Sequence, residues 1–422
     1  MRHIRSPQLV ILLLNIVLHS VKGFSSTTLT RCRQSTFPSI ASLRDDNTMD
    51  EERSDSISRR SAIIGSAQAI SLLLIGTGSP SYSNASYGSS FVQGPCTIVV
   101  TGCNSGIGYD AVKRMAERGH TIIMACRSME KATNAANKIQ QELTDLKLKL
   151  VPKECNLIDL KSIDAFVEDL KRDGLKIDAL CLNAGVARNT AAKDILRTKQ
   201  GFELTIGTNH LGHFYLQNKL FPLMAQKSRI VVTASGVHDP ESPGGAQGSK
   251  ATLGNLKGLE DAVARGDGVF DMIDGGTFDA DKAYKDSKLC NVLYTRELQK
   301  RLDLLPEKDI TVNCFNPGLI VSTGLFRDQN QLFTKVFDFA ATDLLKVGET
   351  VHWGGGALEY MTLDKTVGAK GGLFYSSDPG SSKFLDDAFG NQFKESKISS
   401  EASDDAKARR LWELSEMLVG LV

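Results

Sequence analysis

From Pro95 to the end of the chain, short runs of apolar, often β-branched residues alternate with longer segments in which apolar residues recur every three or four positions. The short runs predict buried strands and the longer segments predict amphipathic helices. One such helix is expected over residues 107–117, with Gly119 closing it. The seven expected strands are Thr97 to Val100, His120 to Cys126, Leu148 to Cys155, Ile177 to Asn183, Arg229 to Thr233, Ile310 to Phe315 and Gly372 to Tyr375.

The order of these elements predicts the fold class. Strands that alternate with helices form a parallel sheet covered on both faces, and right-handed crossovers join the strands. We therefore expect one Rossmann-like, doubly wound α/β domain with a parallel seven-stranded sheet over residues 91–422. One insert, residues 239–282, is too polar to be core throughout and is a candidate gate for a site.

The first residues of the chain lack this alternation and have the features of targeting sequences. Arg2 and Arg5 precede an uncharged apolar run at residues 9–18, which predicts a signal peptide over residues 1–23. The run is too short to span a bilayer.

A second targeting segment is expected over residues 24–90, which resemble a plastid transit region. Within it, Arg59-Arg60 precedes the moderately apolar residues 62–78, as in a twin-arginine thylakoid signal. The alternatives are a linker with a chance arginine pair, or a weak membrane anchor at residues 62–78. Taken together, the two segments predict a plastid protein that is stromal or associated with the thylakoid membrane.

Composition and charge narrow the class of partner. The 422 residues are 41% hydrophobic and 23% charged, which excludes a chain that is disordered throughout, a collagen and a polytopic membrane protein. Lys and Arg number 50 against 49 Asp and Glu, so no global field attracts nucleic acid. We expect a small-molecule partner, and the composition is compatible with a homo-oligomer. Eight scattered cysteines without a C-x-x-C pair predict free, mostly buried thiols.

A glycine-rich turn, Thr101 to Gly108, follows the first expected strand and opens the first expected helix. Glycines let the backbone approach a pyrophosphate closely, and the free N–H groups of the helix start stabilise its charge. A mere tight turn is the alternative. The residues expected to contact a dinucleotide here are Gly102, Asn104, Ser105, Gly106, Ile107 and Gly108.

Residues after the next strands extend this candidate cofactor site. Arg127 follows the second strand, where a guanidinium favours the 2′-phosphate of NADPH, although a solvated surface arginine is the alternative. Asn156 and Leu157 after the third strand are expected to flank an adenine, and Asn183-Ala184-Gly185 ends the fourth strand at the same sheet edge. Ligands bind at the carboxyl ends of strands in such sheets.

The candidate catalytic pair is Tyr284 and Lys288, four residues apart and therefore on one helix face. A phenol with a pKa near ~10 is a poor acid or base at neutral pH, but an ammonium at ~4 Å stabilises its ionised form by about 4 kcal/mol. That energy corresponds to a fall of roughly three units in the phenol's pKa. Two other pairs have this spacing, Tyr109 with Lys113 and Tyr215 with Lys219, and are expected to hold helix-surface or core tyrosines.

Two polar residues complete the candidate catalytic set. Ser235, just after the fifth strand, is expected to orient a substrate or to stabilise developing charge. Asn209 is expected to hold a water that connects Lys288 with solvent. The alternatives are a strand-end turn residue for Ser235 and a helix-packing amide for Asn209.

This ordered set, with Pro317-Gly318 after the sixth strand, resembles the short-chain dehydrogenase/reductase family over residues 95–422. Longer stretches are similar to the light-dependent protochlorophyllide reductases of that family, among them Gly207 to Phe214, Ala283 to Lys288 and Thr323 to Arg327. The resemblance implies NADPH as cofactor, with Ile320 and Ser322 beside it. It also implies addition of a hydride and of a proton from Tyr284 to a C=C bond of a tetrapyrrole in chlorophyll biosynthesis.

The chain departs from that group after the sixth strand. Asn316 and Leu319 stand where the group usually has a tyrosine and a cysteine, and neither can replace an ionisable phenol or thiol. Two other functions therefore remain open: a light-independent reductase of carbonyl or retinol-type substrates, and a non-catalytic NADPH-dependent pigment carrier. An apolar stripe containing Phe326, Phe333 and Phe337 fits either a lid over a large flat substrate or core and oligomer packing.

Overall fold

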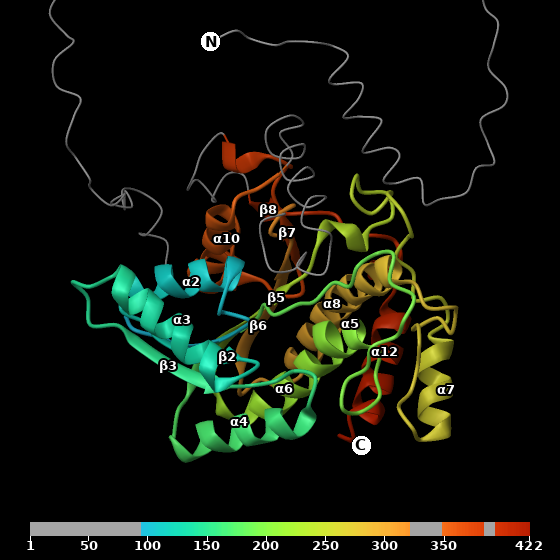
Figure 1. Cartoon of the computed structure of the whole chain (residues 1–422), viewed down its shortest axis with the longest axis horizontal. Coiled ribbons are helices and arrows are strands. Elements are labelled where there is room, and N and C mark those ends of the chain that lie inside the picture. Colours follow the sequence, from blue (N-terminus) through green and yellow to red (C-terminus); the bar gives the residue numbers. More distant parts are fainter. Residues whose placement is uncertain (1–93, 321–347, 384–392) are drawn as a thin grey trace, which may run out of the picture. The chain divides into compact units, whose positions relative to one another are not determined.

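The structure is a computed structural model that describes residues 94–320, 348–383 and 393–422 (Figure 1). The predicted targeting segments (residues 1–90), Cys32, Ser322 and the apolar stripe at residues 325–339 lie outside the described residues. Within the described ranges, no helix is long and apolar enough to cross a membrane.

A single sheet forms the centre of the domain, with the strand order β3-β2-β1-β4-β5-β6-β7-β8. All neighbouring pairs up to β7 are parallel, and the order reverses beside β1, as the predicted doubly wound fold requires. The strands are β1 (Thr97–Thr101), β2 (Thr121–Cys126), β3 (Lys149–Glu154), β4 (Ile177–Leu182), β5 (Met224–Thr233), β6 (Asp309–Phe315), β7 (Phe374–Ser376) and β8 (Lys394–Glu395).

The sheet has eight strands rather than the seven predicted. The additional strand, β8, pairs antiparallel with β7, with Tyr375 opposite Glu395. Its two residues are both charged and exposed, so no apolar run marks it in the sequence. The fifth strand also starts at Met224 rather than at Arg229, because the exposed Gln226 and Lys227 interrupt the apolar run that marks the rest of the strand.

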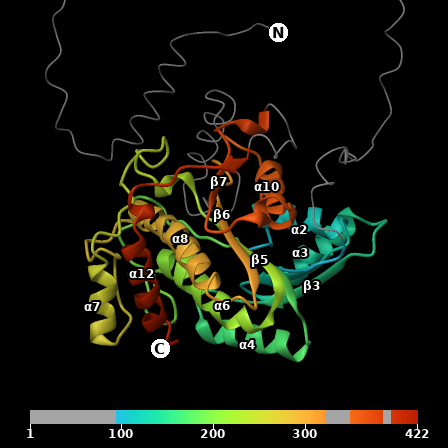
Figure 2. The same ribbon diagram turned by 180° about the vertical axis from the view of Figure 1, so that it is seen from behind.

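Three helices cover each face of the sheet (Figures 1 and 2). One face carries α2 (Gly106–Glu117), α3 (Met129–Glu142) and α10 (Val351–Leu363), and the other carries α4 (Leu160–Arg172), α6 (Gly212–Leu220) and α8 (Ala280–Leu302). Along β1, Ile98 and Val100 pack on the first face and Val99 on the second, which explains the continuous apolar runs. Gly119 has φ +87° just after α2, as predicted for its end.

The last helix, α12 (Asp405–Leu418), packs against α8, and α7 (Lys257–Arg265) packs against α12 (Figures 1 and 2). Trp412 stacks on Tyr294 of α8 with ring centroids 5.9 Å apart and meets Phe214 of α6 edge-on at 4.7 Å. Ser415 accepts a hydrogen bond from His210 at 3.0 Å, because its own hydroxyl donates to a backbone carbonyl of α12. The C-terminal helix therefore belongs to the core behind α6 and α8.

The insert at residues 239–282 contains α7 and contributes to the core. Leu253, Leu259, Phe270 and Ile273 are buried there, so its apolar residues pack inward although its composition is polar. Lys282 and Asp286 at the start of α8 form an ion pair of 2.5 Å, and Asp286 also accepts the backbone N–H of Thr252 at 3.0 Å. These bonds attach the insert to α8.

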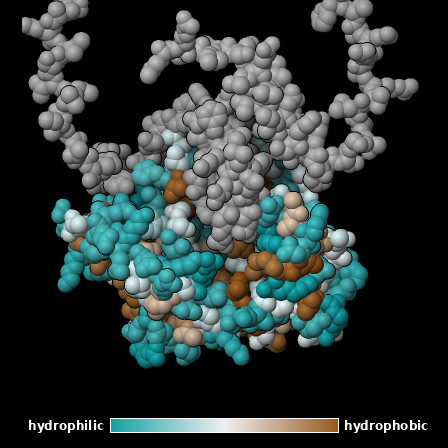
Figure 3. All heavy atoms as spheres, in the orientation of Figure 1, coloured by the Kyte–Doolittle hydropathy of each residue, from teal (hydrophilic) through white to brown (hydrophobic). Residues whose placement is uncertain are grey.

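Short helical turns connect the larger elements. They are α5 (Leu204–Ile206), the π-helical η2 (Gly207–Leu211), η3 (Phe221–Leu223), η4 (Gly236–His238), η7 (Val367–Ala369), η8 (Ser381–Lys383) and η9 (Glu401–Ser403). On the face drawn in Figure 3, most of the described surface is hydrophilic and hydrophobic residues gather near the centre. All seven described cysteines are free and six are buried, as predicted.

Candidate active site

Most of the candidate cofactor residues, and Ser235, lie just after the carboxyl ends of strands, at one edge of the sheet, while Asn209 lies in η2 and Tyr284 and Lys288 lie in α8. A chain of close contacts links them. The turn after β1 packs on the end of β4, the Thr233 hydroxyl of β5 donates to Asn183 at 3.4 Å, and Lys288 of α8 donates to the Thr233 carbonyl at 2.9 Å. The fold therefore brings the predicted cofactor turn and the predicted catalytic helix together.

The glycine-rich turn packs too closely for side chains at two positions. Gly102 has φ +66°, and a Cβ there would lie 2.7 Å from the Cα of Ala184. A Cβ at Gly108 would lie 2.6 Å from the Nδ2 of Asn183. Glycine is therefore required to seat the turn on the end of β4.

The start of α2 suits an anion. Ser105 at its N-cap makes no side-chain capping bond, and the first turn holds no acidic residue. The backbone N–H groups of this turn are consequently available to a phosphate, and no carboxylate of that turn repels it. Ile107 packs against α10, since a Cβ at Gly354 would lie 2.8 Å from the Cγ1 of Ile107.

Thr101 at the end of β1 organises the turn, and sequence reasoning missed it. Its hydroxyl oxygen accepts the backbone N–H groups of Asn183 at 2.9 Å and Ala184 at 3.0 Å. The Nε2 of His213 lies 2.9 Å from the same oxygen, and the Nδ1 of His213 lies 3.2 Å from the Asn209 carbonyl. Burial lowers the pKa of His213 to about 4, so its neutral ring connects the turn to the helix that carries Asn209.

Arg127, Asn156 and Leu157, the residues predicted to bind the adenosine half of the cofactor, differ in exposure and contacts. Arg127 follows β2 with an exposed side chain that makes no hydrogen bond or ion pair with another described residue. Asn156 donates its backbone N–H to Ser162 at 3.0 Å. Leu157 is buried, and its carbonyl lies 2.4 Å from where a Cβ at Gly212 would stand, so it packs on the start of α6.

Tyr284 and Lys288 share one face of α8, as predicted. The Lys288 ammonium lies over the Tyr284 ring, with its Nζ 5.6 Å from the ring centroid. Burial lowers the pKa of Lys288 to about 8. A Cβ at Gly185 would lie 3.9 Å from the Lys288 Nζ and 3.6 Å from the Asn209 Oδ1, which places Gly185 between the two side chains.

The expected fall in the pKa of Tyr284 is wrong for the protein alone. Burial raises the pKa of Tyr284 well above its usual value. Two physical reasons account for the difference. The Lys288 ammonium lies over the ring, 5.6 Å from its centroid, and burial penalises the phenolate more than the lysine stabilises it. The phenol therefore keeps its proton at neutral pH.

Asn209 lies in the π-helical η2, a type of helix irregularity that is frequent at functional sites. Its Nδ2 donates to the Val186 carbonyl and to the Ser287 hydroxyl, both at 3.0 Å, and its Oδ1 accepts the Val186 N–H at 2.8 Å. Both amide hydrogens are thus engaged, and one lone pair of Oδ1 remains for the predicted water. The amide ties the loop after β4 to α8, next to Lys288.

Ser235 is partly exposed at the N-cap of η4, which packs against α8. Its carbonyl accepts a hydrogen bond of 2.7 Å from the Nδ1 of His238, a residue that sequence reasoning missed. The Nε2 of His238 accepts the Ser399 N–H at 3.4 Å, and its ring meets Phe374 edge-on at 4.8 Å. Burial lowers the pKa of His238, so a neutral imidazole holds the backbone of Ser235 in place.

The loop after β6 carries Pro317 and Gly318. Gly318 has φ +88°, and a Cβ there would lie 2.4 Å from the Cγ of Glu349. The buried carboxylate of Glu349 accepts the backbone N–H groups of Ser381 and Ser382, both at 2.9 Å. Ile320 is buried and packs near Gly354 of α10.

Asn316 and Leu319, which depart from the family pattern, both form bonds with neighbouring residues. The Nδ2 of Asn316 donates to the Ser376 hydroxyl at 3.1 Å, and its Oδ1 accepts the Gly318 N–H at 3.2 Å. Leu319 pairs with Gly348 in a single parallel bridge. Asn316 thus fixes the loop after β6 and offers no ionisable group.

The other two tyrosine–lysine pairs hold helix-surface or core tyrosines, as predicted: Tyr109 is partly exposed and the Tyr215 ring is buried. Tyr109 and Lys113 both donate to Glu142 of α3, at 3.0 and 2.7 Å. Tyr215 donates to Asp164 of α4 at 2.9 Å, and Lys219 forms an ion pair of 2.8 Å with the same carboxylate.

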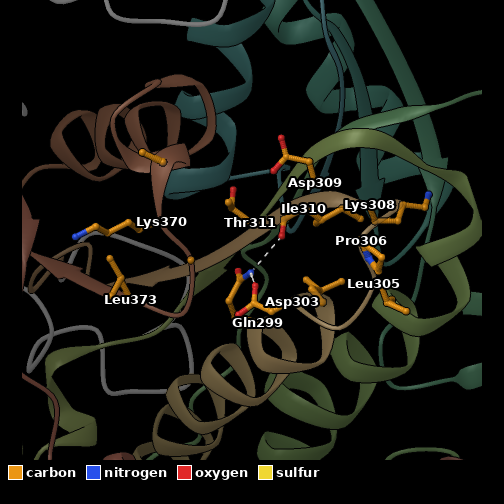
Figure 4. A pocket seen from close by; sticks show the side chains of 13 residues that line it. Gln299, Asp303, Leu305, Pro306, Lys308, Asp309, Ile310, Thr311, Lys370 and Leu373 are labelled. Carbon is orange, nitrogen blue, oxygen red and sulfur yellow. Dashed lines mark hydrogen bonds between the residues drawn. The ribbon is translucent and has the colours of Figure 1, made fainter.

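A cavity of about 490 Å³ lies at the opposite edge of the sheet (Figure 4). Gln299, Asp303, Lys308, Asp309 and Lys370 are among its lining residues, and β6 begins there. None of the candidate residues lines this cavity, so it is separate from the candidate active site.

Comparisons with known proteins agree with this geometry. A sequence profile of the family described as short chain dehydrogenase matches residues 96–256. The chain is 36% identical over 334 residues to the chloroplastic protochlorophyllide reductase of Cucumis sativus, which covers 77% of this chain and 78% of the relative. It is 35% identical over 375 residues to the chloroplastic protochlorophyllide reductase A of Arabidopsis thaliana, covering 88% and 86% of the two chains.

A solved structure of similar fold is that of an uncharacterized protein from Mycobacterium paratuberculosis. Its TM-score is 0.54 at 27% sequence identity, and the match covers 79% of this chain and 96% of the other.

Proposed function

The chain belongs to the short-chain dehydrogenase/reductase family and is an oxidoreductase with a nicotinamide cofactor, and from this premise we propose that it reduces protochlorophyllide or a closely related tetrapyrrole with NADPH. One observation carries the proposal: a lysine lies over a protonated tyrosine on α8, beside the end of β5 and the glycine-rich turn. The relatives named protochlorophyllide reductase support the choice of substrate.

The residues present fit a bound NADPH. The close packing at Gly102 and Gly108 seats the turn, the start of α2 without a side-chain cap suits a pyrophosphate, and the exposed Arg127 after β2 suits a 2′-phosphate. Asn183 to Gly185 and the Pro317-Gly318 loop are proposed to border the nicotinamide half. The bound cofactor supplies a hydride to the substrate.

Tyr284 is proposed to supply the proton. Its hydroxyl is protonated at neutral pH, as a proton donor must be, and burial holds it in that state until the ammonium of Lys288 stabilises the phenolate formed on transfer. Lys288 stabilises the phenolate that remains after transfer, since its ammonium is already beside the ring. Ser235, fixed by His238, is proposed to orient the substrate, and Asn209 to hold Ser287 and a water beside Lys288.

A second function, light-independent reduction of a carbonyl substrate, is favoured by one observation. Asn316 and Leu319 replace the phenol and thiol of the protochlorophyllide reductases, and Asn316 is already bonded to Ser376. A carbonyl substrate needs only the Tyr284 proton and the hydride.

The deciding experiment compares dark and illuminated reactions of the purified chain with NADPH. We expect chlorophyllide to form from protochlorophyllide only under illumination, and a Tyr284→Phe variant to lose most of this turnover. The matched control is Tyr109→Phe, which removes a hydroxyl bonded to Glu142 away from the site. NADPH consumption in the dark with aldehydes or ketones, without chlorophyllide formation, would establish the second function. Unchanged pigment turnover in Tyr284→Phe would point to a carrier with another chemistry.

The location of the protein is proposed from its first ninety residues and from its relatives. The names of the Cucumis sativus and Arabidopsis thaliana relatives include the word chloroplastic. We propose a plastid protein with a signal peptide at residues 1–23, a transit region at residues 24–90 and a reductase domain at residues 91–422, either stromal or associated with the thylakoid membrane. Import of a fluorescent fusion of residues 1–90 into plastids, followed by fractionation, tests this, and gel filtration tests the proposed homo-oligomer.

A further inference from the structure

Two buried thiols lie under the glycine-rich turn. The Sγ atoms of Cys103, in the turn, and Cys126, the last residue of β2, are 3.6 Å apart and in hydrogen-bond contact. Cys103 is 0% and Cys126 1% exposed. Neither is among the residues that the family resemblance assigns to the cofactor, although their neighbours Gly102 and Arg127 are.

The surroundings make the two thiols unequal. Contact with the Cys103 side chain lowers the pKa of Cys126, with further help from the backbone N–H of Cys103 and from Lys131. Burial raises the pKa of Cys103. Cys126 is therefore the better nucleophile and Cys103 the proton-bearing partner, an asymmetry that suits stepwise oxidation of a thiol pair.

We propose that Cys103 and Cys126 are a redox modification site, at which a peroxide converts the pair to an internal disulfide that weakens cofactor binding. The Cys126 thiolate attacks one oxygen of hydrogen peroxide, the O–O bond breaks, and hydroxide leaves, which gives a sulfenic acid. The Cys103 sulfur then attacks that sulfur, an S–S bond forms, and the sulfenic oxygen leaves as water with the Cys103 proton. The peroxide is reduced by two electrons and the two thiols are oxidised by two.

The effect on the cofactor follows from the packing of the turn, and it rests on the proposed function. An S–S bond is about 2.05 Å long, so the sulfurs must approach by roughly 1.5 Å from their present contact of 3.6 Å. The turn has little room to follow, because Gly102 is already packed on Ala184 and Gly108 on Asn183. The closure therefore displaces the backbone N–H groups that face a pyrophosphate.

Burial also makes the reaction sensitive to the cofactor. Since neither sulfur is exposed, peroxide reaches Cys126 only when the turn opens. A nucleotide seated on the turn keeps it closed, and the reduced, cofactor-bound protein is protected.

The test treats the full chain with hydrogen peroxide, with and without NADPH, and maps thiols by alkylation and mass spectrometry. We expect a crosslink between the peptides that hold Cys103 and Cys126, slower in NADPH and reversed by dithiothreitol. The oxidised protein should bind NADPH about tenfold more weakly or worse, because a displacement near 1 Å at a binding turn has effects of that size. In Cys103→Ala, peroxide should leave NADPH affinity unaltered.

The matched control is Cys181→Ser, which changes a buried thiol bonded to Thr362 and should keep the crosslink. Absence of the Cys103–Cys126 crosslink overturns the proposal, and so does a crosslinked protein that binds NADPH as tightly as the reduced one. If the reduced chain fails to bind NADPH at all, the proposed function fails, while the crosslink itself still decides whether the pair is oxidised.

Discussion

The helices α6 and α8 carry the same Tyr-x-x-x-Lys spacing but surround it differently. On α6, Tyr215 and Lys219 share the carboxylate of Asp164, which neutralises the ammonium and occupies the hydroxyl. On α8, Lys288 donates to the carbonyl of Thr233 and lies over the Tyr284 ring, with no carboxylate paired to it among the described residues. We infer that a tyrosine–lysine pair can support proton transfer only where no carboxylate neutralises the charge of the lysine.

Replacement of the two tyrosines should give the largest contrast. We expect Tyr284→Phe to lower kcat by about 10²- to 10⁴-fold, because it removes the proposed general acid. Tyr215→Phe should leave kcat within about twofold, since its hydroxyl binds Asp164 of α4, away from the candidate site. Steady-state turnover of both variants checks this, and an equal loss in the two would remove the distinction between the helices.

The two lysines should differ in pH dependence. The pKa of Lys288 is lowered by burial to about 8, so the ammonium is present below that pH and is lost as the pH rises through it. We expect the rate of the wild-type enzyme to fall above pH ~8, and Lys288→Met to lose about a hundredfold in kcat/KM. Lys219→Met should keep the wild-type profile.

A Lys288→Arg variant sharpens the assignment. Its guanidinium stays charged, so the alkaline fall near pH ~8 should disappear even though the altered geometry lowers the rate. An alkaline fall that persists in this variant would assign the titration to another group.

Gly108 in the glycine-rich turn and Gly119 after the end of α2 differ in how much room a side chain would have. A Cβ at Gly108 meets Asn183 and the Gly102 carbonyl at 2.6 Å, whereas a Cβ at Gly119 meets nothing within 4 Å. Gly108→Ala should weaken NADPH binding about tenfold and destabilise the fold by about 1–3 kcal/mol. Gly119→Ala has only the positive φ to accommodate, at about 1 kcal/mol, and should leave NADPH affinity unchanged. Titration of NADPH fluorescence and thermal unfolding separate the two effects.

The last contrast concerns stability rather than turnover, and it compares Asp286 of α8 with Asp164 of α4. Burial raises the pKa of Asp286 to about 7, against about 3.9 in an unfolded chain. The folded state therefore binds the additional proton between these values, and stability falls as the pH rises from about 4 to 7. Asp286→Asn should flatten this part of the Tm–pH curve. Asp164→Asn, at an exposed pair, should change stability by about 1 kcal/mol or less.

Much of the fold follows from the sequence because its strands are buried on both faces. The runs around Val99 and Ile123 are continuously apolar and predict their strands within a residue or two. β8 could not be found in this way, since its two residues are charged and its pairing with β7 depends on the rest of the sheet.

The sequence motif was enough to predict which residues form the candidate site. Their pKa values and their hydrogen-bond partners depend on the tertiary structure and could not be predicted from the motif. The motif located Tyr284 and Lys288, but the raised pKa of Tyr284 comes from its tertiary surroundings. His213 contacts the hydroxyl of Thr101, and His238 contacts the carbonyl of Ser235. No sequence motif links either histidine to its partner, so these contacts become visible only in the folded structure. The contact between Cys103 and Cys126 was within reach, because both lie at the ends of adjacent parallel strands.

The hydrogen bond between His210 and Ser415 has a consequence for the order of folding. His210 is the neighbour of Asn209, and Ser415 lies 205 positions later, on α12. Asn209 therefore reaches its final surroundings only once α12 has docked behind α6 and α8. A folding intermediate with a complete sheet but an undocked α12 has an incomplete candidate site.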